Sequence, residues 1–186
     1  MYDEHFKEKK FLRTMSQASG TLERRFSNTL RFLHGVSPPP ARILDLGTPN
    51  ELGRRMAGAG YEVINTEGDL EEATREIGAD ADIVTAFEIL EHLVTPYNVL
   101  RAIQAPRLVA TVPLRLWFAP AYCNPDDPWD RHFHEFEAWQ FDWLLEHAGW
   151  RIVRAEKWVS YGALTGIRPL LRRFTPRYYA VEAVRQ

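Results

Sequence analysis

The sequence predicts an α/β protein with a three-layer, doubly wound and mostly parallel sheet. Short apolar runs, rich in Val, Ile and Leu, alternate with longer amphipathic stretches along most of the chain. The last two runs follow one another and are separated only by an irregular segment. This alternation is typical of parallel strands joined by helices that cover both faces of a sheet. The expected strands are 42–46, 61–64, 82–87, 107–112, 150–159 and 178–184.

The expected helices have apolar residues at helical spacing or clear start and stop signals. Two of them lie in an N-terminal extension, residues 1–36, and the Ser37–Pro40 linker leads from it into an α/β domain, residues 37–186, within a single-domain chain. The helix at 136–148 carries an apolar stripe that we expect to face the sheet, formed by Phe136, Trp139, Trp143, Leu144 and His147. The other expected helices are 3–34 (two helices, parted near residue 19), about 50–58, 70–77 and about 96–104.

Composition excludes several classes of protein. The 186 residues carry a net charge of −2, which gives no electrostatic reason to expect a nucleic-acid partner. Cys123 is the only cysteine, so no intrachain disulfide can form. The charged N-terminus lacks the apolar core of a signal peptide, and no apolar run is long enough to span a bilayer. We therefore expect a cytoplasmic protein, and no motif indicates its oligomeric state.

The turn after the first strand is the first candidate for a ligand site. The strand Ile43–Leu46 contains Asp45 near its carboxyl end, and Gly47 follows directly before a helix. In open α/β sheets, ligands bind beyond the carboxyl ends of the strands, where a tight turn leads into a helix N-terminus. The segment Thr48–Glu51 has the pattern of a capping box, with Thr48 as the N-cap and Pro49 at the first helical position.

Four segments, in order, resemble the class I S-adenosylmethionine-dependent methyltransferases of the small-molecule type. They are the first strand with its glycine turn at 43–47, the second strand ending in an acid at 60–67, the segment 82–93 that ends in Glu-His-Leu, and 109–150 with its fifth strand, loop and following helix. The resemblance covers about residues 20–184. It implies a Rossmann-like methyltransferase fold with six or seven strands, the final strand being antiparallel.

The resemblance also implies a cofactor, S-adenosylmethionine, and residues that bind it. The Gly47 turn is expected at the methionine end, Asp45 is expected to orient that end or the turn itself, and Glu67 is expected to accept both ribose hydroxyls. Asp69 is a candidate for the adenine amino group and equally for a surface acid. The full set of expected cofactor-binding residues is Asp45, Gly47, Thr48, Asn50, Glu67, Asp69, Phe87 and Glu88.

Two departures from the family pattern leave a second hypothesis open. Only Gly47 remains of the three glycines usual in the turn, and Thr48 and Pro49 add bulk there. The 14 residues between Glu67 and Asp82 leave room for one short helix and little else, so a third strand is missing. The leading hypothesis is methyl transfer to a small-molecule acceptor, at oxygen rather than nitrogen. The alternative is a degenerate methyltransferase-like domain that acts as a binding or scaffold protein without catalysis.

Histidines are the candidate general bases, because an imidazole titrates near neutral pH and can take a proton from a hydroxyl. His92, beside Glu91, lies in the Glu-His-Leu motif, and His132 and His134 lie in the loop that the resemblance assigns to the acceptor pocket. Each could instead have a purely structural role. Asp130-x-His132-x-His134 also resembles a metal-binding set, but no other ligand cluster is evident, so we expect no metal site.

Two further groups of residues allow alternative functions. Aromatic residues of the long loop could form a lid over the acceptor or only cover the edge of the sheet: Trp117, Phe118, Tyr122 and Trp129. The arginines of segment 168–177 could meet an anionic substrate, a lipid headgroup or a partner, although a solvated amphipathic helix is the commoner explanation: Arg168, Arg172, Arg173 and Arg177.

Overall fold

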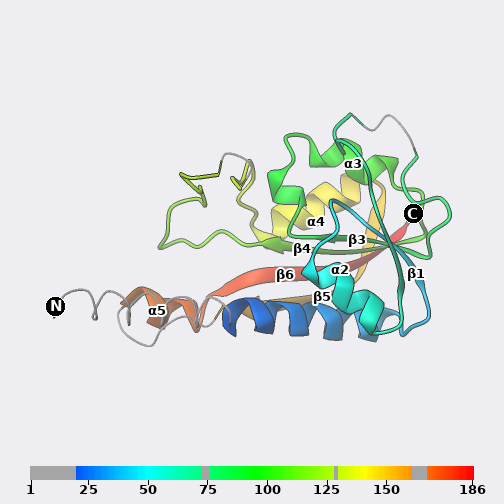
Figure 1. Ribbon diagram of the computed structural model, residues 1–186. Coiled ribbons are helices and arrows are strands. Elements are labelled where there is room, and N and C mark those ends of the chain that lie inside the picture. The colour runs from blue at the N-terminus through cyan, green and yellow to red at the C-terminus, as the bar shows by residue number, and fades with distance from the viewer. Residues whose placement is uncertain (1–19, 73–75, 128–129, 161–166) are drawn as a thin grey trace.

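The computed structural model describes residues 20–72, 76–127, 130–160 and 167–186, and these form a six-stranded sheet with helices on both faces (Figure 1). The strand order is β2-β1-β3-β4-β6-β5. Strands β1 to β4 are parallel to one another, whereas β6 is antiparallel to both of its neighbours. The expected mostly parallel sheet with an antiparallel final strand is therefore confirmed.

Apolar runs with β-branched residues form the strands, as the sequence predicts. The strands are β1 (Arg42–Asp45), β2 (Glu62–Asn65), β3 (Ile83–Phe87), β4 (Arg107–Pro113), β5 (Trp150–Val159) and β6 (Pro176–Arg185). β3 and β4 are buried along almost their whole length, which is expected of central parallel strands covered on both faces.

In the described part of the chain, four helices begin and end within a few residues of their expected bounds: residues 20–36, α2 (Glu51–Gly58), α3 (Pro96–Ala102) and α4 (Ala138–His147). The structure also contains the 3₁₀ turn η1 (Leu90–His92) and the helix α5 (Ile167–Arg172), for which no bounds were predicted. The first of the two N-terminal helices expected from the sequence lies outside the described residues. None of the described helices is long and apolar enough to cross a membrane.

The expected helix at 70–77 is wrong for the residues that the structure describes there. Residues 70–72 form bends, and Ile77 makes an isolated parallel bridge with Ile103; residues 73–75 are not described. The 14 residues between Glu67 and Asp82 are too few to form both a helix and a strand. Leu70 and Ile77 hold this segment in place, because their side chains are buried in the core. No strand pairs with the free edge of β2 in the described residues, which agrees with the missing third strand.

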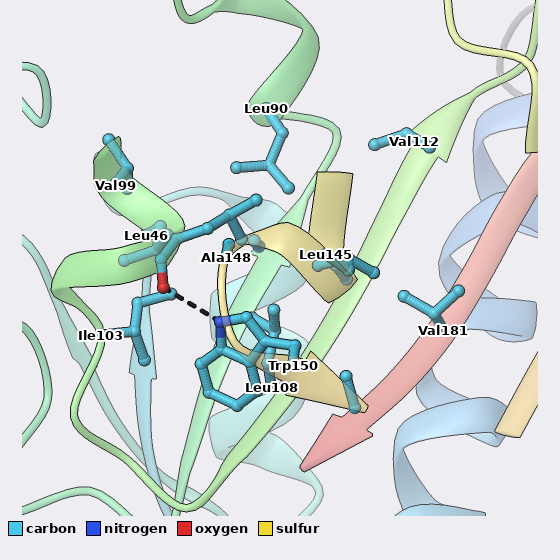
Figure 2. Packing of buried hydrophobic residues seen from close by; sticks show 14 of the residues in the cluster. Leu46, Leu90, Val99, Ile103, Leu108, Val112, Leu145, Ala148, Trp150 and Val181 are labelled. Carbon is cyan, nitrogen blue, oxygen red and sulfur yellow. Dashed lines mark hydrogen bonds between the residues drawn. The ribbon is translucent and has the colours of Figure 1, made fainter. Parts of the chain in front are cut away.

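Two apolar clusters hold the layers together. Helices α3 and α4 pack on one face of the sheet around Trp150, whose indole N–H donates a 3.0 Å hydrogen bond to the Leu100 carbonyl (Figure 2). The helix of residues 20–36 and α2 cover the other face through Phe32, Leu33 and Met56 (Figure 1). The N-terminal helix is therefore packed against the sheet, and it lies near the carboxyl ends of β1, β3 and β4.

The apolar stripe expected on α4 is only partly correct: Phe136 is buried and Leu144 packs against the core, whereas Trp139, Trp143 and His147 are exposed. Phe141 and Leu145 are fully buried, whereas Trp139 and Trp143 are 61% and 58% exposed. Trp139 and Trp143 each lie two residues from Phe141 and therefore on the opposite side of the helix, where the Trp139 indole N–H donates a hydrogen bond to the Glu137 carboxylate. Aromatic content alone therefore did not identify the buried face of this helix.

Candidate functional site

The turn after β1 is closed by the protein's own side chains. Gly47 has a φ of +96°, a conformation that favours glycine, and a Cβ at this position would lie 2.7 Å from Ile89 Cδ1, so the end of that side chain would have to move. The Gly47 N–H donates a 2.7 Å hydrogen bond to the Thr66 hydroxyl, and its carbonyl accepts one of 3.1 Å from the Asn65 amide. The backbone donor that the family pattern offers to a ligand is thus already satisfied here.

The helix that follows begins later than the sequence predicts. Asn50, not Thr48, is the N-cap of α2, because its side-chain oxygen accepts the Gly53 N–H at 3.0 Å. Thr48 is exposed and contributes only its carbonyl, which accepts a hydrogen bond from Asn50 Nδ2. Pro49 therefore precedes the cap instead of occupying the first helical position, so the predicted capping box is wrong.

Asp45 joins the ends of three strands. It is 2% exposed, accepts a 2.6 Å hydrogen bond from the Thr85 hydroxyl of β3, and lies 3.4 Å from the Asn65 amide of β2. Burial raises the pKa of Asp45, and these hydrogen bonds act in the opposite direction because they stabilise the carboxylate. This geometry supports the expectation that Asp45 orients the turn.

A small cavity of about 190 Å³ lies between the N-terminal helix and the carboxyl ends of β1, β3 and β4. Polar groups from both layers face it, which suits a charged ligand group more than an apolar one. Its lining residues include Arg25, Asp45, Asn50, Phe87, Glu88 and Thr111. Four of the expected cofactor-binding residues therefore come together at this place.

Glu88 stands between this cavity and a larger one. It directly follows β3 with a φ of +53°, a strained conformation for a residue with a side chain. One carboxylate oxygen lies 3.4 Å from the Arg25 guanidinium, while the other, Oε1, is buried without a hydrogen-bond partner among the described residues. Burial raises the pKa of Glu88, and Arg25 partly counteracts this effect.

The other two acids expected to bind the cofactor lie outside both cavities. Glu67 and Asp69 are exposed beyond the end of β2, and Asp69 accepts a 2.8 Å hydrogen bond from the Glu71 N–H. Glu67 is two residues past the strand, on the same edge of the sheet as Gly47. The position is compatible with a ribose contact, and the roles of both acids stay predictions.

The larger cavity has a volume of about 360 Å³ and a strongly polar lining. It lies beyond the carboxyl ends of β3 and β4, under the loop that follows β4. Carboxylates, imidazoles, guanidinium groups and phenols all border it: Arg25, Glu88, Glu91, His92, Tyr122, Asp130, His132, Arg177 and Tyr178, together with Pro113. Arg25 and Glu88 border both cavities, so the two lie side by side.

Glu91 is the most deeply buried acid of this cavity. Its side chain is 1% exposed, and Oε2 has no hydrogen-bond partner among the described residues. Burial, followed by the negative charge of Glu88, raises the pKa of Glu91 well above its usual range. Its backbone carbonyl accepts the N–H groups of Phe133 and His134, at 2.8 and 3.2 Å, and so holds the loop over the cavity.

Two histidines face one another beside Glu91. The rings of His92 and His132 meet edge to face with 4.9 Å between their centroids. Nδ1 of His92 lies 3.0 Å from the Arg131 carbonyl, and Nδ1 of His132 lies 3.1 Å from a Glu135 carboxylate oxygen. Burial lowers the pKa of His132, an effect that Glu135 opposes.

His134 does not line this cavity. Its Nε2 lies 3.3 Å from the Val94 carbonyl, and its ring stacks on Phe136 at 5.5 Å. Of the four predicted catalytic residues, the structure therefore brings together Glu91, His92 and His132, and leaves His134 apart from them.

Sequence reasoning missed several residues of this cavity. Arg25 lies on the N-terminal helix and reaches it across the layers, where its guanidinium also lies over the Tyr178 ring at 5.8 Å. Arg177 is not part of a surface helix: it begins β6, donates a 2.6 Å hydrogen bond to the Leu114 carbonyl, and is largely buried. Of the expected surface arginines, Arg168, Arg172 and Arg173 are exposed on or beside α5.

The expected aromatic lid is only partly present. Trp117 is 73% exposed and contacts Phe118, so these two residues do not cover the cavity. Tyr122 does line it, and its hydroxyl donates a 2.7 Å hydrogen bond to Asp130. Trp129 lies outside the described residues.

Comparison with known proteins identifies the fold. No family model and no curated protein matches the sequence. A chain from the complex between the Haloferax volcanii Trm112 methyltransferase activator and a methyltransferase is similar in structure, with a TM-score of 0.65 at 12% identity over 93% of this chain and 95% of that one. The 1,6-didemethyltoxoflavin-N1-methyltransferase of Burkholderia thailandensis, solved with S-adenosylhomocysteine, gives 0.60 at 18% identity over 99% and 90%.

A third similar structure has another activity. The cyclase SpnF gives a TM-score of 0.55 at 15% identity over 86% of this chain and 80% of its own. At these identities the likeness establishes fold, while activity depends on the residues of the site. The chain therefore has the fold of the S-adenosylmethionine-dependent methyltransferases.

Proposed function

We propose that this protein transfers a methyl group from S-adenosylmethionine to a small polar acceptor, at oxygen rather than nitrogen. The observation that carries the proposal is the pair of adjoining cavities that share Arg25 and Glu88 at the carboxyl ends of the strands. In open α/β sheets this edge is where ligands bind. A cytoplasmic location, and a small molecule instead of a nucleic acid as the acceptor, belong to the same proposal.

The smaller cavity fits the amino-acid end of the cofactor. At about 190 Å³ it is below the usual size of a pocket for a whole ligand of this kind, so it can take only one end. The Arg25 guanidinium suits a carboxylate, and the unpartnered Glu88 Oε1 suits an ammonium group. The nucleoside part would then follow the open edge past Gly47 towards Glu67, where a carboxylate can accept two ribose hydroxyls.

When bound, this cofactor supplies an electrophilic methyl group on a sulfonium. The chain's own contribution is to position the acceptor and to take its proton. His132 is the better base of the two loop histidines that the sequence indicates. Burial favours its neutral form, and Glu135 beside Nδ1 leaves the Nε2 lone pair free to accept a proton from an acceptor hydroxyl. His92 is the second candidate.

A binding protein without catalysis is the second candidate function. The observation in its favour is the turn after β1, where Thr66 uses the Gly47 N–H and Ile89 fills the space beside the glycine. A closed turn of this kind offers fewer donors to the charged end of a cofactor. Peripheral contacts through the exposed arginines of α5 would fit this function as well.

Calorimetric titration of the full chain with S-adenosylhomocysteine separates the two functions. The enzyme hypothesis predicts saturable binding that weakens at least about tenfold in Arg25→Ala, because a charged hydrogen bond is lost. Arg31→Ala is the matched control: it is on the same helix but pairs with Glu156 at the surface, and it should bind as the wild type does. If millimolar S-adenosylhomocysteine gives no heat of binding and no change in the Tm of the protein, the enzyme hypothesis is refuted.

A further inference from the structure

One group of side chains in the larger cavity has the arrangement of a metal site. Glu91, His92 and His132 each offer one ligand atom, and these atoms lie within 4.8 Å of one another. Ligands of one metal ion at bond lengths near 2.1 Å lie about 3 to 4 Å apart, so small rotations of the side chains would close the set. Glu91 and His92 come from the rigid turn η1, and His132 comes from the loop that the Glu91 carbonyl anchors.

Hydrogen bonds to the far side of both imidazoles support this interpretation. In metal sites a ligating histidine almost always donates its other ring N–H to a carboxylate or a backbone carbonyl. Both acceptors are present here: the Arg131 carbonyl lies 3.0 Å from His92 Nδ1, and the Glu135 carboxylate lies 3.1 Å from His132 Nδ1. This fixes the tautomer in which each Nε2 carries a free lone pair.

The buried carboxylate of Glu91 is the second, independent observation. Its side chain is 99% buried, and Oε2 lacks a hydrogen-bond partner among the described residues. The only basic group that the described residues bring within 4 Å is the His92 imidazole, at 3.9 Å from Oε1. Arg25 pairs with Glu88, and Arg177 is committed to the Leu114 carbonyl and to Glu135. A buried acid in this position is costly unless a cation meets it.

We propose that Glu91, His92 and His132 bind one divalent transition-metal ion in the larger cavity. Two imidazole nitrogens and one carboxylate oxygen are a donor set suited to Zn²⁺, Fe²⁺ or Co²⁺, whereas Mg²⁺ and Ca²⁺ prefer oxygen ligands alone. Three protein ligands leave coordination positions open towards the cavity, as in catalytic metal sites.

This site differs from the pattern that the sequence suggests. In Asp130-x-His132-x-His134, only His132 belongs to it. The Asp130 carboxylate accepts hydrogen bonds from Tyr122 and Asn124, and His134 Nε2 faces the Val94 carbonyl. The set is assembled instead from two segments about 40 residues apart in the sequence.

Metal binding itself does not depend on methyl transfer. A role for the ion in catalysis would rest on the proposed function: a hydroxyl bound to the metal loses its proton more readily. His92 and His132 would then act as ligands and not as bases.

The proposal is tested by treating the full chain with a chelator and then titrating it with Zn²⁺ in a calorimeter. In a second experiment, the visible absorption spectrum of bound Co²⁺ reports the type and number of its ligands. We expect one ion per chain. Glu91→Gln and His132→Ala should each weaken binding at least about tenfold. Glu135→Gln should weaken it about tenfold, since losing the carboxylate that holds a ligating histidine costs about 10 to 100-fold in metal affinity. His134→Ala, two residues along the same loop, is the matched control and should bind as the wild type does.

Two results would overturn the proposal: no saturable Zn²⁺ binding, or binding that Glu91→Gln and His132→Ala leave unchanged. Far-ultraviolet circular dichroism of each variant establishes that it is folded, and His92→Gln replaces any variant that is not. Because no nucleoside ligand is present, the result is independent of whether S-adenosylhomocysteine binds.

Discussion

Replacing Glu91 by glutamine should stabilise the metal-free protein at neutral and alkaline pH. The substitution keeps the shape of the side chain and removes a charge whose only basic partner within 4 Å, among the described residues, is the His92 imidazole; Arg25 and Arg177 act on it from farther away. Burial and the neighbouring Glu88 raise the pKa of Glu91 well above the 4.5 of a free glutamate. The folded state therefore binds this proton more tightly than the unfolded state does.

The sign of the pH dependence follows from this difference. Between pH 4.5 and the raised pKa the folded state holds the Glu91 proton more firmly, so the contribution of Glu91 to the free energy of unfolding falls as pH rises. Glu91→Gln does not take part in this titration. The two proteins should have similar stability near pH 4, and the variant should be more stable at pH 8. Leaving a buried polar group unsatisfied costs about 1–3 kcal/mol, and each kcal/mol shifts the Tm of a domain of this size by about 2–4 °C.

Differential scanning calorimetry in the presence of a chelator, from pH 4 to pH 8, measures this difference. Glu146→Gln, an exposed position on α4, makes the same chemical change and should leave the Tm almost unchanged at every pH. Added Zn²⁺ should raise the Tm of the wild type more than that of Glu91→Gln, which reduces the difference between them. A wild type more stable than Glu91→Gln at pH 8 without metal would refute the reasoning.

Three further substitutions test other parts of the structure. Gly47→Ala should destabilise the fold by about 1–3 kcal/mol in urea denaturation, because of its positive φ and the close Ile89 side chain, whereas Gly58→Ala, in open space on α2, should not destabilise it. Trp150→Phe should cost about 1–3 kcal/mol, since it leaves a buried backbone carbonyl without its donor. If Glu67 holds the ribose, Glu67→Ala should weaken S-adenosylhomocysteine binding about tenfold or more, and unchanged affinity would contradict this role.

The elements of the sheet could be predicted because their signals are local. The apolar runs of β3 and β4 and the boundaries of β5 are visible in the sequence, and the mostly parallel arrangement follows from the alternation with helices. The start of α2 was wrong because Thr48 and Asn50 are both good caps, and tertiary contacts decide between them. The Asn50 side chain both caps the helix and bonds back to the Thr48 carbonyl, which the Thr48 side chain cannot do.

The face of α4 could not be predicted from apolar content. Trp139 and Trp143 are as hydrophobic as Phe141 and Leu145, and all four recur at helical spacing. What distinguishes them is the partner across the layer, because Phe141 packs against Tyr179 of β6. That partner comes from another part of the chain.

Local sequence spacing was also insufficient to predict which histidine reaches the larger cavity. His132 and His134 would share one face only in an extended chain, where residues two apart point the same way. The loop bends at Phe133, because the Glu91 carbonyl accepts the N–H groups of both Phe133 and His134. The bend turns His132 to His92 and His134 to Phe136. A single carbonyl in the Glu-His-Leu motif thus decides which histidine reaches the cavity, and spacing within the loop carries no information about it.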